Sequence, residues 1–348
     1  MKRSPVNLRA LLLVTRERNP KGIALFATAL MKLVRAGFAD VEEDVDDLLE
    51  SLISLRSPGQ PHSCWGYNFD WQSRGGLVPR GTPNIICTTA AGNALLDAYE
   101  SRGRKTLLDI ASSAGEFLFR DLYVENGASE ARFNYTPLGQ TTVHNANLLG
   151  AAYICRLYRL TGDPRFRDPV FKAARYSVSR QHRDGSWDYG EREVPSQRWK
   201  DNFHTGFNLG ALADIARYGD TTEFDNSIER GYAYYLRNFF TDDGAPKYYH
   251  DRTYPIDAHC VAQSLITLCE FRDLNPTSMQ IAGSVYSWAI KNMRSKNGYF
   301  FYQKLPSYTN RISYMRWTQA WMLLGLATLL THAEKSSSHV ENTAKAIP

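Results

Sequence analysis

Histidine and aspartate side chains recur at the polar starts of apolar helices predicted from this sequence. Asp201 stands three residues before His204. Asp257 stands two residues before His259, and His144 opens another helix of the same kind. Imidazole and carboxylate groups can exchange protons near neutral pH, so these five residues are the candidate catalytic groups. An aspartate in such a place can also be only an N-cap, but imidazole caps helices poorly. The three equivalent histidines therefore predict a common site.

A second set of polar and aromatic residues could bind a substrate around these groups. Four of them lie in the segment 57–83, and a long loop in a compact domain usually has a function. Tyr67, in this loop, is a further candidate acid or base. The candidate substrate-binding residues are Trp65, Asp70, Trp71, Arg74, Asn145, Asn202, Asn208, Tyr189, Arg316, Trp317 and Gln319.

The spacing of histidines and cysteines gives no metal-binding motif. No HxxxH or HExxH sequence places two histidines on one helix face, so a metal site would have to be assembled from three repeats. Five cysteines form no CxxC pair, and four of them lie in apolar helices, which predicts buried free thiols. We therefore predict neither a metal nor a cofactor.

Four Asn-Gly or Asp-Gly turns mark a repeat along the chain. Asn126-Gly127, Asp184-Gly185, Asp243-Gly244 and Asn297-Gly298 are spaced 58, 59 and 54 residues apart. Each is followed by aromatic residues and then by a helix with a polar start. A fixed period of this length with two helices in each unit predicts a helical-hairpin repeat. In one unit, Trp187 is expected to pin the turn against its helix and so to be structural.

The predicted helices alternate between two kinds. Helices that are apolar all round must be enclosed, whereas amphipathic helices must lie outermost. We predict an all-α fold, an (α/α)6 toroid or six-hairpin barrel, in which six enclosed helices are ringed by six outer ones. The enclosed helices are expected from Pro20 to Gly37 and at 84–100, 142–160, 204–218, 256–272 and 313–331, and the outer ones at 5–16, 42–55, 104–122, 165–182, 222–240 and 276–294. The starts of the enclosed helices then share one end of the ring, where helix N-termini favour an anionic ligand.

Length and composition set further limits. The chain has 348 residues, 43% of them apolar, enough to bury a large core. Residues 1–335 are expected to form one domain, followed by a polar, disordered tail at 336–348. A scattered net charge of +5 argues against nucleic-acid binding and is compatible with an anionic substrate. No apolar run approaches 18 residues, so we predict no membrane span. The start lacks a signal-peptide cleavage site, which favours a cytoplasmic location.

One resemblance indicates terpene chemistry and not carbohydrate chemistry. Gln181-x-x-x-Gly185-x-Trp187 resembles the QW repeat of squalene-type triterpene cyclases, which are also α/α toroids. Asp44-Val-Asp46-Asp47 matches the DxDD proton donor of those enzymes. Here, however, it begins an outer amphipathic helix, where acidic residues favour the N-terminus and face water. The chain is also far shorter than a two-toroid cyclase.

A second resemblance favours carbohydrate chemistry. The helix pattern and the polar starts resemble unsaturated glucuronyl hydrolases, toroidal polysaccharide lyases, N-acylglucosamine 2-epimerases and the C-terminal domain of glucuronyl C5-epimerases. The segments 19–26, 64–74 and 201–208 also resemble a family encoded in bacterial capsule and lipopolysaccharide gene clusters. This resemblance implies an enzyme of surface-polysaccharide metabolism with an oligosaccharide or polysaccharide substrate.

Three interpretations of the site follow. Proton abstraction beside a uronate carboxylate, giving a lyase or C5-epimerase, needs a neutralising group such as Asn145, Asn202 or Arg316, and the histidines or Tyr67 as acid and base. Glycoside hydrolysis needs two opposed carboxylates, for which only Asp70, Asp201 and Asp257 are well placed. A toroid that binds a glycan without reaction is the third. The wealth of His and Asn favours the first.

Overall fold

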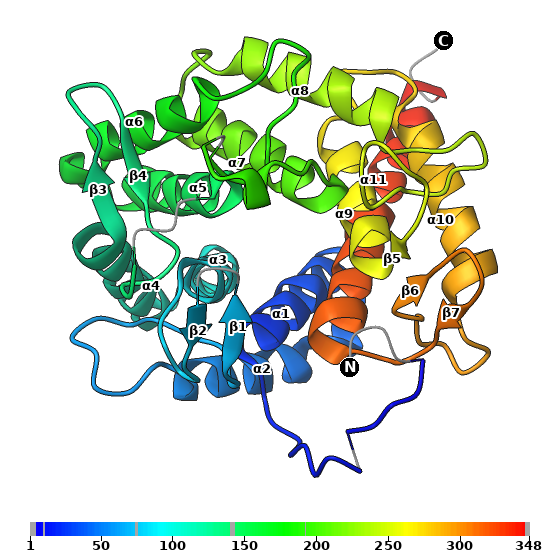
Figure 1. The fold of residues 1–348 in the computed structure, drawn as a ribbon, viewed down its shortest axis with the longest axis horizontal. Helices are drawn as coiled ribbons and strands as arrows, with labels where there is room; N and C mark the ends of the chain where they lie inside the picture. Colours follow the sequence, from blue (N-terminus) through cyan, green and yellow to red (C-terminus); the bar gives the residue numbers. More distant parts are fainter. Residues whose placement is uncertain (1–4, 10, 74–75, 140–142, 192, 345–348) are drawn as a thin grey trace.

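The computed structural model describes residues 5–9, 11–73, 76–139, 143–191 and 193–344. Helices dominate it, and their order along the chain can be followed in Figure 1. The α-helices are α1 (Pro20–Arg35), α2 (Glu42–Ser54), α3 (Ile85–Arg102), α4 (Lys105–Phe117), α5 (His144–Thr161), α6 (Arg167–Val178), α7 (Asn202–Gly219), α8 (Asp225–Asn238), α9 (Ala258–Glu270), α10 (Ser278–Met293) and α11 (Ala320–Ala344).

The odd-numbered helices form an inner ring. Each contacts the next along the chain, from α1 through α3, α5, α7 and α9 to α11, and α11 packs on α1 to close the ring (Figure 1). The even-numbered helices lie outside. Burial follows the same division, since α9 buries nearly every residue from Ala258 to Cys269, whereas α2 buries little beyond Val45, Leu49 and Leu52. The fold is an (α/α)6 toroid, as the alternation of helix types predicts.

The ring departs from the prediction at one outer position. Residues 5–16 are expected to form an outer helix, but the described residues of this segment contain none. Leu11, Leu12, Leu13 and Val14 are consecutive and cannot share one helix face, and Leu13 has a positive φ of 50°. A segment this short also forms a stable helix only when it packs on something. The described residues therefore supply five outer helices, α2, α4, α6, α8 and α10.

The last inner helix extends into the segment that is expected to be a tail. Helix α11 continues to Ala344, so it includes most of the tail that the sequence predicts to be disordered, and residues 345–348 lie outside the described part. No helix among the described residues is long and apolar enough to cross a bilayer. The division into one domain and a tail remains a prediction.

Short strands stiffen the connections that lead from outer to inner helices. The loop before α3 contains the antiparallel pair β1 (Trp71–Ser73) and β2 (Gly76–Val78), with Trp71 opposite Val78. The connection before α5 contains β3 (Tyr123–Glu125) and β4 (Ala131–Phe133), also antiparallel. The last is a three-stranded sheet of order β5-β6-β7, formed by β5 (Ile256–Asp257), β6 (Gln303–Lys304) and β7 (Thr309–Asn310). These pairings hold the loops at the end of the ring where the inner helices begin.

Short helical turns complete these connections. The 3-10 turns are η1 (Ala39–Val41), η3 (Pro164–Phe166) and η4 (Pro195–Gln197), and the π-helical turns are η2 (Leu118–Leu122) and η5 (Met315–Gln319). Turn η5 leads directly into α11, so it occupies the same place in the ring as the starts of the other inner helices.

The Asp184-Gly185 turn shows how the repeat is built. Trp187 is 2% exposed and its Nε1 donates to the carbonyl of Ser177 at 2.9 Å, so its role is structural, as predicted. Gly185 has a φ of +93°, and a Cβ there would lie 2.1 Å from the carbonyl oxygen of Arg230. The turn is thus pressed directly against α8.

Gly185→Ala should therefore lower the free energy of unfolding by about 3 kcal/mol. The left-handed backbone costs an alanine ~1–2 kcal/mol, and the clash with Arg230 adds ~1–3 kcal/mol. Gly298→Ala is the matched control, because Gly298 has a φ of +92° and nothing within 4 Å of the added Cβ. Urea denaturation of both variants measures the difference, and equal losses would show that the contact with α8 is not tight.

Candidate active site

The starts of the inner helices carry the candidate site. Asn19 caps α1 by accepting from the amide of Gly22 at 3.0 Å. Asp201 caps α7 in the same way, and Asp257 caps α9. Phe203, at the start of α7, stacks on His259 of α9 with ring centroids 4.4 Å apart. Ring closure then brings Arg316 of η5 beside Gly22 of α1. Residues from α1, α7, α9 and η5 thus meet at one end of the ring.

His204 and Asp201 form a dyad at the start of α7. Nδ1 of His204 lies 2.6 Å from Oδ2 of Asp201, and Trp199 Nε1 donates to the same oxygen at 2.8 Å. A carboxylate that already accepts from an indole fixes the imidazole tautomer with hydrogen on Nδ1, which leaves Nε2 free to take a proton. The side chain of His204 is 20% exposed. The dyad can therefore act as a general base toward a bound ligand.

His259 lies next to the dyad in a different environment. It is 1% exposed and is enclosed between Phe203 at 4.4 Å and Trp321 at 4.3 Å. Neither ring nitrogen has a hydrogen-bond partner among the described residues. Burial, and then the positive charges of Lys21 and Arg316, hold the pKa of His259 well below its ordinary value of 6.5. His259 is thus a neutral imidazole with two free polar atoms in an aromatic enclosure.

Asp257 is a positioning residue rather than a free acid. It is fully buried, and its Oδ1 accepts from the amide of His259 at 2.8 Å and from Trp317 Nε1 at 3.0 Å. Its Oδ2 accepts from Gln303 at 3.3 Å. Trp317 in turn meets the ring of His259 edge-on at 4.7 Å. Both carboxylate oxygens are thus occupied in holding the walls around His259.

Two cations stand close to His259 without a carboxylate beside them. Lys21, near the start of α1, is 7% exposed and its Nζ lies 5.3 Å from the ring centroid of Trp321. Burial, followed by the charge of Arg316, lowers the pKa of Lys21 to about 8. The guanidinium of Arg316 lies over the ring of Tyr67 at 5.2 Å. Neither cation forms an ion pair within the part of the chain that the structure describes.

Lys21 is a site residue that reasoning from the sequence misses. The signal was present, because a buried cation in the first turn of a helix opposes the helix dipole and needs another reason to be there. Phe203 and Trp321 were also missed. Trp321 lies in an apolar stretch of an inner helix, where an aromatic side chain is ordinarily part of the core, and Phe203 stands between the polar residues Asn202 and His204.

A second aromatic cluster faces Arg316 from the loop before α3. Tyr67 stacks on Phe69 at 5.2 Å and meets Trp71 at 5.9 Å, and Trp71 lies 5.1 Å from Tyr135. Burial raises the pKa of Tyr67 to about 12, so its hydroxyl stays protonated at neutral pH and can donate but not act as a base. Trp71 is half-buried and remains a candidate for stacking on a substrate.

Three predicted substrate-binding residues have structural roles. Trp65 is fully buried, and its Nε1 donates to the carbonyl of Leu52 at 2.8 Å. Asn202 is also fully buried, where it bonds Tyr235 and Ser264. The amide of Gln319 is occupied by both backbone groups of Phe300. Trp65 and Asn202 have no exposed face left for a sugar, because they are fully buried and satisfy polar groups of the fold. Gln319 is half-buried and remains a candidate.

Two further predicted residues, His144 and Tyr189, lie in different surroundings. His144 is 3% exposed and its Nδ1 lies 3.2 Å from the hydroxyl of Ser177 on α6, so it is directed to the outer ring. Burial lowers the pKa of His144 to about 4. The structure therefore brings together His204 and His259 but not His144. Tyr189 stays beside the dyad, with its ring 4.6 Å from that of His204.

Two buried amides and two loop residues are the last of the predicted set. Asn145 and Asn208 are 4% and 3% exposed, and the Oδ1 atom of each has no partner among the described residues. They remain candidates. Asp70 accepts from the backbone amide of Arg80 at 2.8 Å on the exposed part of its loop. Arg74 lies outside the described residues.

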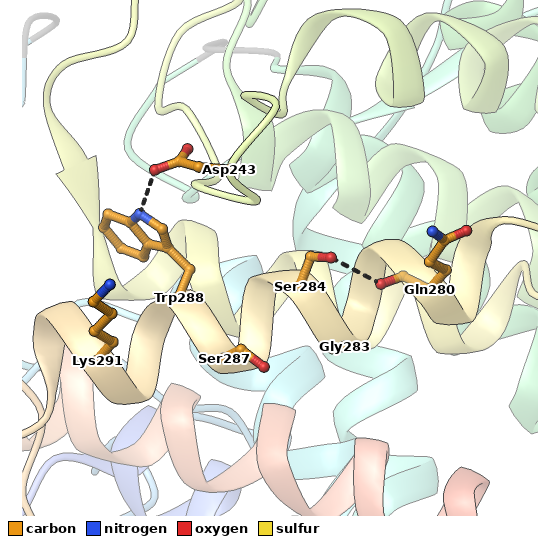
Figure 2. Close-up of a pocket in the computed structure, with 7 residues that line it drawn as sticks. All are labelled: Asp243, Gln280, Gly283, Ser284, Ser287, Trp288 and Lys291. Atoms are coloured by element: carbon orange, nitrogen blue, oxygen red, sulfur yellow. Dashed lines mark hydrogen bonds between the residues drawn. The ribbon is translucent and has the colours of Figure 1, made fainter.

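A surface pocket of about 530 Å³ lies away from this cluster, on outer helix α10 (Figure 2). Figure 2 shows Trp288 reaching up to Asp243, with Nε1 donating at 3.2 Å, and the small residues Gly283, Ser284 and Ser287 along the helix. None of the predicted site residues lines it. Within the described chain, no group of three or more His, Cys, Asp or Glu residues is placed to hold a metal ion.

The inner ring of helices and the polar cluster at its N-terminal end place this chain among the (α/α)6 toroids. Among solved structures, it is similar to a cellobiose 2-epimerase from Bacillus thermoamylovorans, with a TM-score of 0.72, 10% identity, and 91% of this chain and 88% of that chain covered. It is similar to a family GH76 α-mannanase from Bacteroides thetaiotaomicron, with a TM-score of 0.68, 13% identity and coverage of 92% and 86%.

A D-mannose isomerase is similar as well, with a TM-score of 0.68, 12% identity and coverage of 90% and 86%. The sequence matches no protein-family model and shows no significant similarity to a curated protein. At these identities the likeness establishes the fold, and the chemistry has to be argued from the residues of the site.

Proposed function

We propose that the protein is a carbohydrate-active enzyme of bacterial surface-polysaccharide metabolism that acts on a uronate-containing glycan by proton abstraction, as a lyase or C5-epimerase. The observation that carries the proposal is the dyad of His204 and Asp201, with Nδ1 of the imidazole 2.6 Å from Oδ2 of the carboxylate and the side chain of His204 20% exposed. Such a base can remove a proton beside a carbonyl or carboxylate group. The toroids of similar structure include an epimerase and an isomerase, which supports sugar chemistry of this kind.

The unpaired cations support an anionic substrate. The carboxylate of a uronate is negatively charged in the bound substrate and gains further negative charge when the proton at C5 is removed, so it needs neutralisation both on binding and during the reaction. Lys21 and Arg316 can provide it from one side, because no carboxylate of the described residues pairs with them. His259 can donate a hydrogen bond from its neutral ring without adding charge.

Glycoside hydrolysis is the second candidate. It is favoured by the similar α-mannanase and by the neighbouring places of Asp201 and Asp257. Burial, and then the charges of both aspartates, raise the pKa of Cys260 well above its ordinary value, so both carboxylates lie near that thiol. A hydrolase needs one carboxyl group as acid and another as base or nucleophile. Here Asp201 accepts from Trp199 and His204, and Asp257 accepts from Trp317 and Gln303. Since both carboxylates are engaged, proton abstraction fits the geometry better.

Terpene cyclisation and glycan binding without reaction have less support. The acidic motif that resembles a cyclase proton donor lies on outer helix α2, where Asp46 pairs with Arg102 and Arg104. It is therefore remote from the N-terminal end of the inner ring. A purely glycan-binding toroid would not need an imidazole fixed by a buried carboxylate, because such a group tunes proton transfer and adds little to affinity.

The test is incubation with uronate-containing oligosaccharides in deuterated water, read by ultraviolet absorbance and proton NMR. An unsaturated uronate would establish a lyase, and deuterium at C5 without new absorbance would establish an epimerase. New reducing ends without either signal would establish a hydrolase and overturn the proposal. Binding without any of these signals would assign the protein to glycan recognition.

A further inference from the structure

Exposed apolar side chains gather at the end of the ring that carries the site. Among the described residues, all but three of the exposed large apolar side chains lie in segments that lead into inner helices. The exceptions are Phe38, Leu274 and Tyr286. The others include Leu77, Leu138 and Met315, which are 59%, 63% and 61% exposed on three separate connections. Isolated apolar side chains are ordinary on a surface, but a concentration at one end indicates a binding surface.

The segment before α1 contributes most of this surface. Leu11, Leu12, Leu13 and Val14 are consecutive and are 78%, 50%, 86% and 48% exposed. Two contacts place this segment at the end of the ring that carries the site. The guanidinium of Arg9 lies 4.4 Å from the ring centroid of Tyr314, directly before η5. Glu17 pairs with Arg80, in the loop before α3, at 2.8 Å.

The charge of this segment is one-sided. Residues 1–18 contain the bases Lys2, Arg3, Arg9, Arg16 and Arg18 and a single acid, Glu17. Glu17 is engaged by Arg80 and by Asn68, so its charge is offset within the protein. An apolar stretch whose flanking sequence has more bases than acids suits the surface of an anionic membrane, where negatively charged headgroups cover an apolar interior.

We propose that the site end of the ring binds the surface of an anionic lipid bilayer, with residues 11–14 entering the headgroup region. A bilayer fits better than a second copy of the chain, because a contact between two copies of this segment would bring its excess of bases against an equal excess. The bases on either side of residues 11–14 then meet lipid phosphates. Binding of this kind is peripheral, and it does not require any helix to span the membrane.

The experiment is co-sedimentation of the full chain with vesicles of phosphatidylcholine containing phosphatidylglycerol, and with vesicles of phosphatidylcholine alone. We expect binding to the anionic vesicles, weakened by added salt because the electrostatic part is screened. The triple variant Leu11→Ser, Leu12→Ser, Leu13→Ser should weaken this binding by about tenfold or more. The double variant Leu274→Ser, Tyr286→Ser is the matched control, since it removes exposed apolar residues elsewhere and should bind as the unaltered protein does.

Three results would overturn the proposal. The first is failure of the unaltered protein to sediment with anionic vesicles, and the second is an equal loss of binding in the triple and control variants. The third is a dimer, detected by light scattering, that the triple variant abolishes, because the segment would then bind a second copy. Residues 11–13 are exposed, so the triple variant should keep its circular dichroism spectrum and unfolding midpoint. None of these results bears on the proton-abstraction chemistry, which is tested separately in deuterated water.

Discussion

Replacing His204 by alanine should lower turnover by ~10²- to 10⁴-fold while the fold remains intact. The reason is that His204 carries the one imidazole in the site that is both partly exposed and oriented by a carboxylate, through its 2.6 Å contact with Asp201. Deuterium incorporation at C5, or formation of the unsaturated uronate, measures the rate. Circular dichroism should be unchanged, because His204 does not cap its helix.

Asp201→Asn tests how much the orientation of the His204 imidazole contributes to activity, because the imidazole itself is kept. An asparagine can still accept from the backbone of His204, but its amide nitrogen would face two donors, Nδ1 of His204 and Nε1 of Trp199. The imidazole would then lose its preferred tautomer, and activity should fall while much of the helix cap is kept.

Asp257→Asn is the control that decides between the two candidate reactions. Asp257 holds Trp317 and the start of α9 and is not needed as a base, so this variant should retain activity. His259→Ala should abolish turnover, since it empties the aromatic enclosure beside the dyad. If Asp257→Asn is inactive and His204→Ala retains turnover, the protein is a hydrolase and the proton-abstraction proposal is wrong.

Lys21→Met should raise the KM for an anionic glycan by about 10- to 100-fold, with a smaller effect on kcat. A charged hydrogen bond contributes about 1.5–3 kcal/mol, which corresponds to that change in affinity. Since burial lowers the pKa of Lys21 to about 8, the affinity of the unaltered enzyme should fall as the pH rises through 8 and the ammonium loses its proton. The variant should lack this pH dependence.

The same substitution should have the opposite effect on stability. The pKa of Lys21 is lowered on folding from 10.5 to about 8, so the unfolded chain binds more protons between these values and stability rises with pH across that window. At neutral pH the buried cation therefore costs the folded state roughly 3 kcal/mol. Lys21→Met should raise the midpoint of thermal unfolding even though it weakens binding.

Lys105→Met provides the comparison for both measurements. Lys105 is exposed at the start of α4, and removing its charge should change neither the KM nor the unfolding midpoint. A variant at Lys21 that is more stable but binds the glycan with unchanged KM would show that the cation does not contact the substrate. Arg316→Met should behave like Lys21→Met in KM, because the two cations flank the same place.

The fold could be predicted because its determinants are local and repeated. Each inner helix is apolar on all sides and each outer helix on one, and that difference alone requires two concentric layers. The dyad could be predicted for a related reason. Asp201 and His204 are three residues apart, and the geometry of a helix N-cap brings such residues together whatever the rest of the chain does.

Residues 5–16 show where local reasoning fails. Their apolar content predicts a helix, but a short segment gains helical structure only from packing, and the sequence does not say whether a partner surface is present. The same limit applies to Trp65 and Asn202. Both are residue types that can bind a sugar. Only the packed structure shows that their polar atoms already form hydrogen bonds with Leu52, Tyr235 and Ser264.

The sequence by itself determined the toroid, the end of the ring that carries the candidate site, and the pairing of Asp201 with His204. Only the tertiary structure decided which groups surround them. Lys21 and Arg316 lie near opposite ends of the chain, and they meet because α11 packs on α1 when the ring closes. His259 becomes a neutral group because Phe203 and Trp321, from two other helices, enclose it. Burial and charge at the site depend on contacts between segments that are distant in the sequence. Such contacts produce no periodic pattern of residues from which they could be predicted.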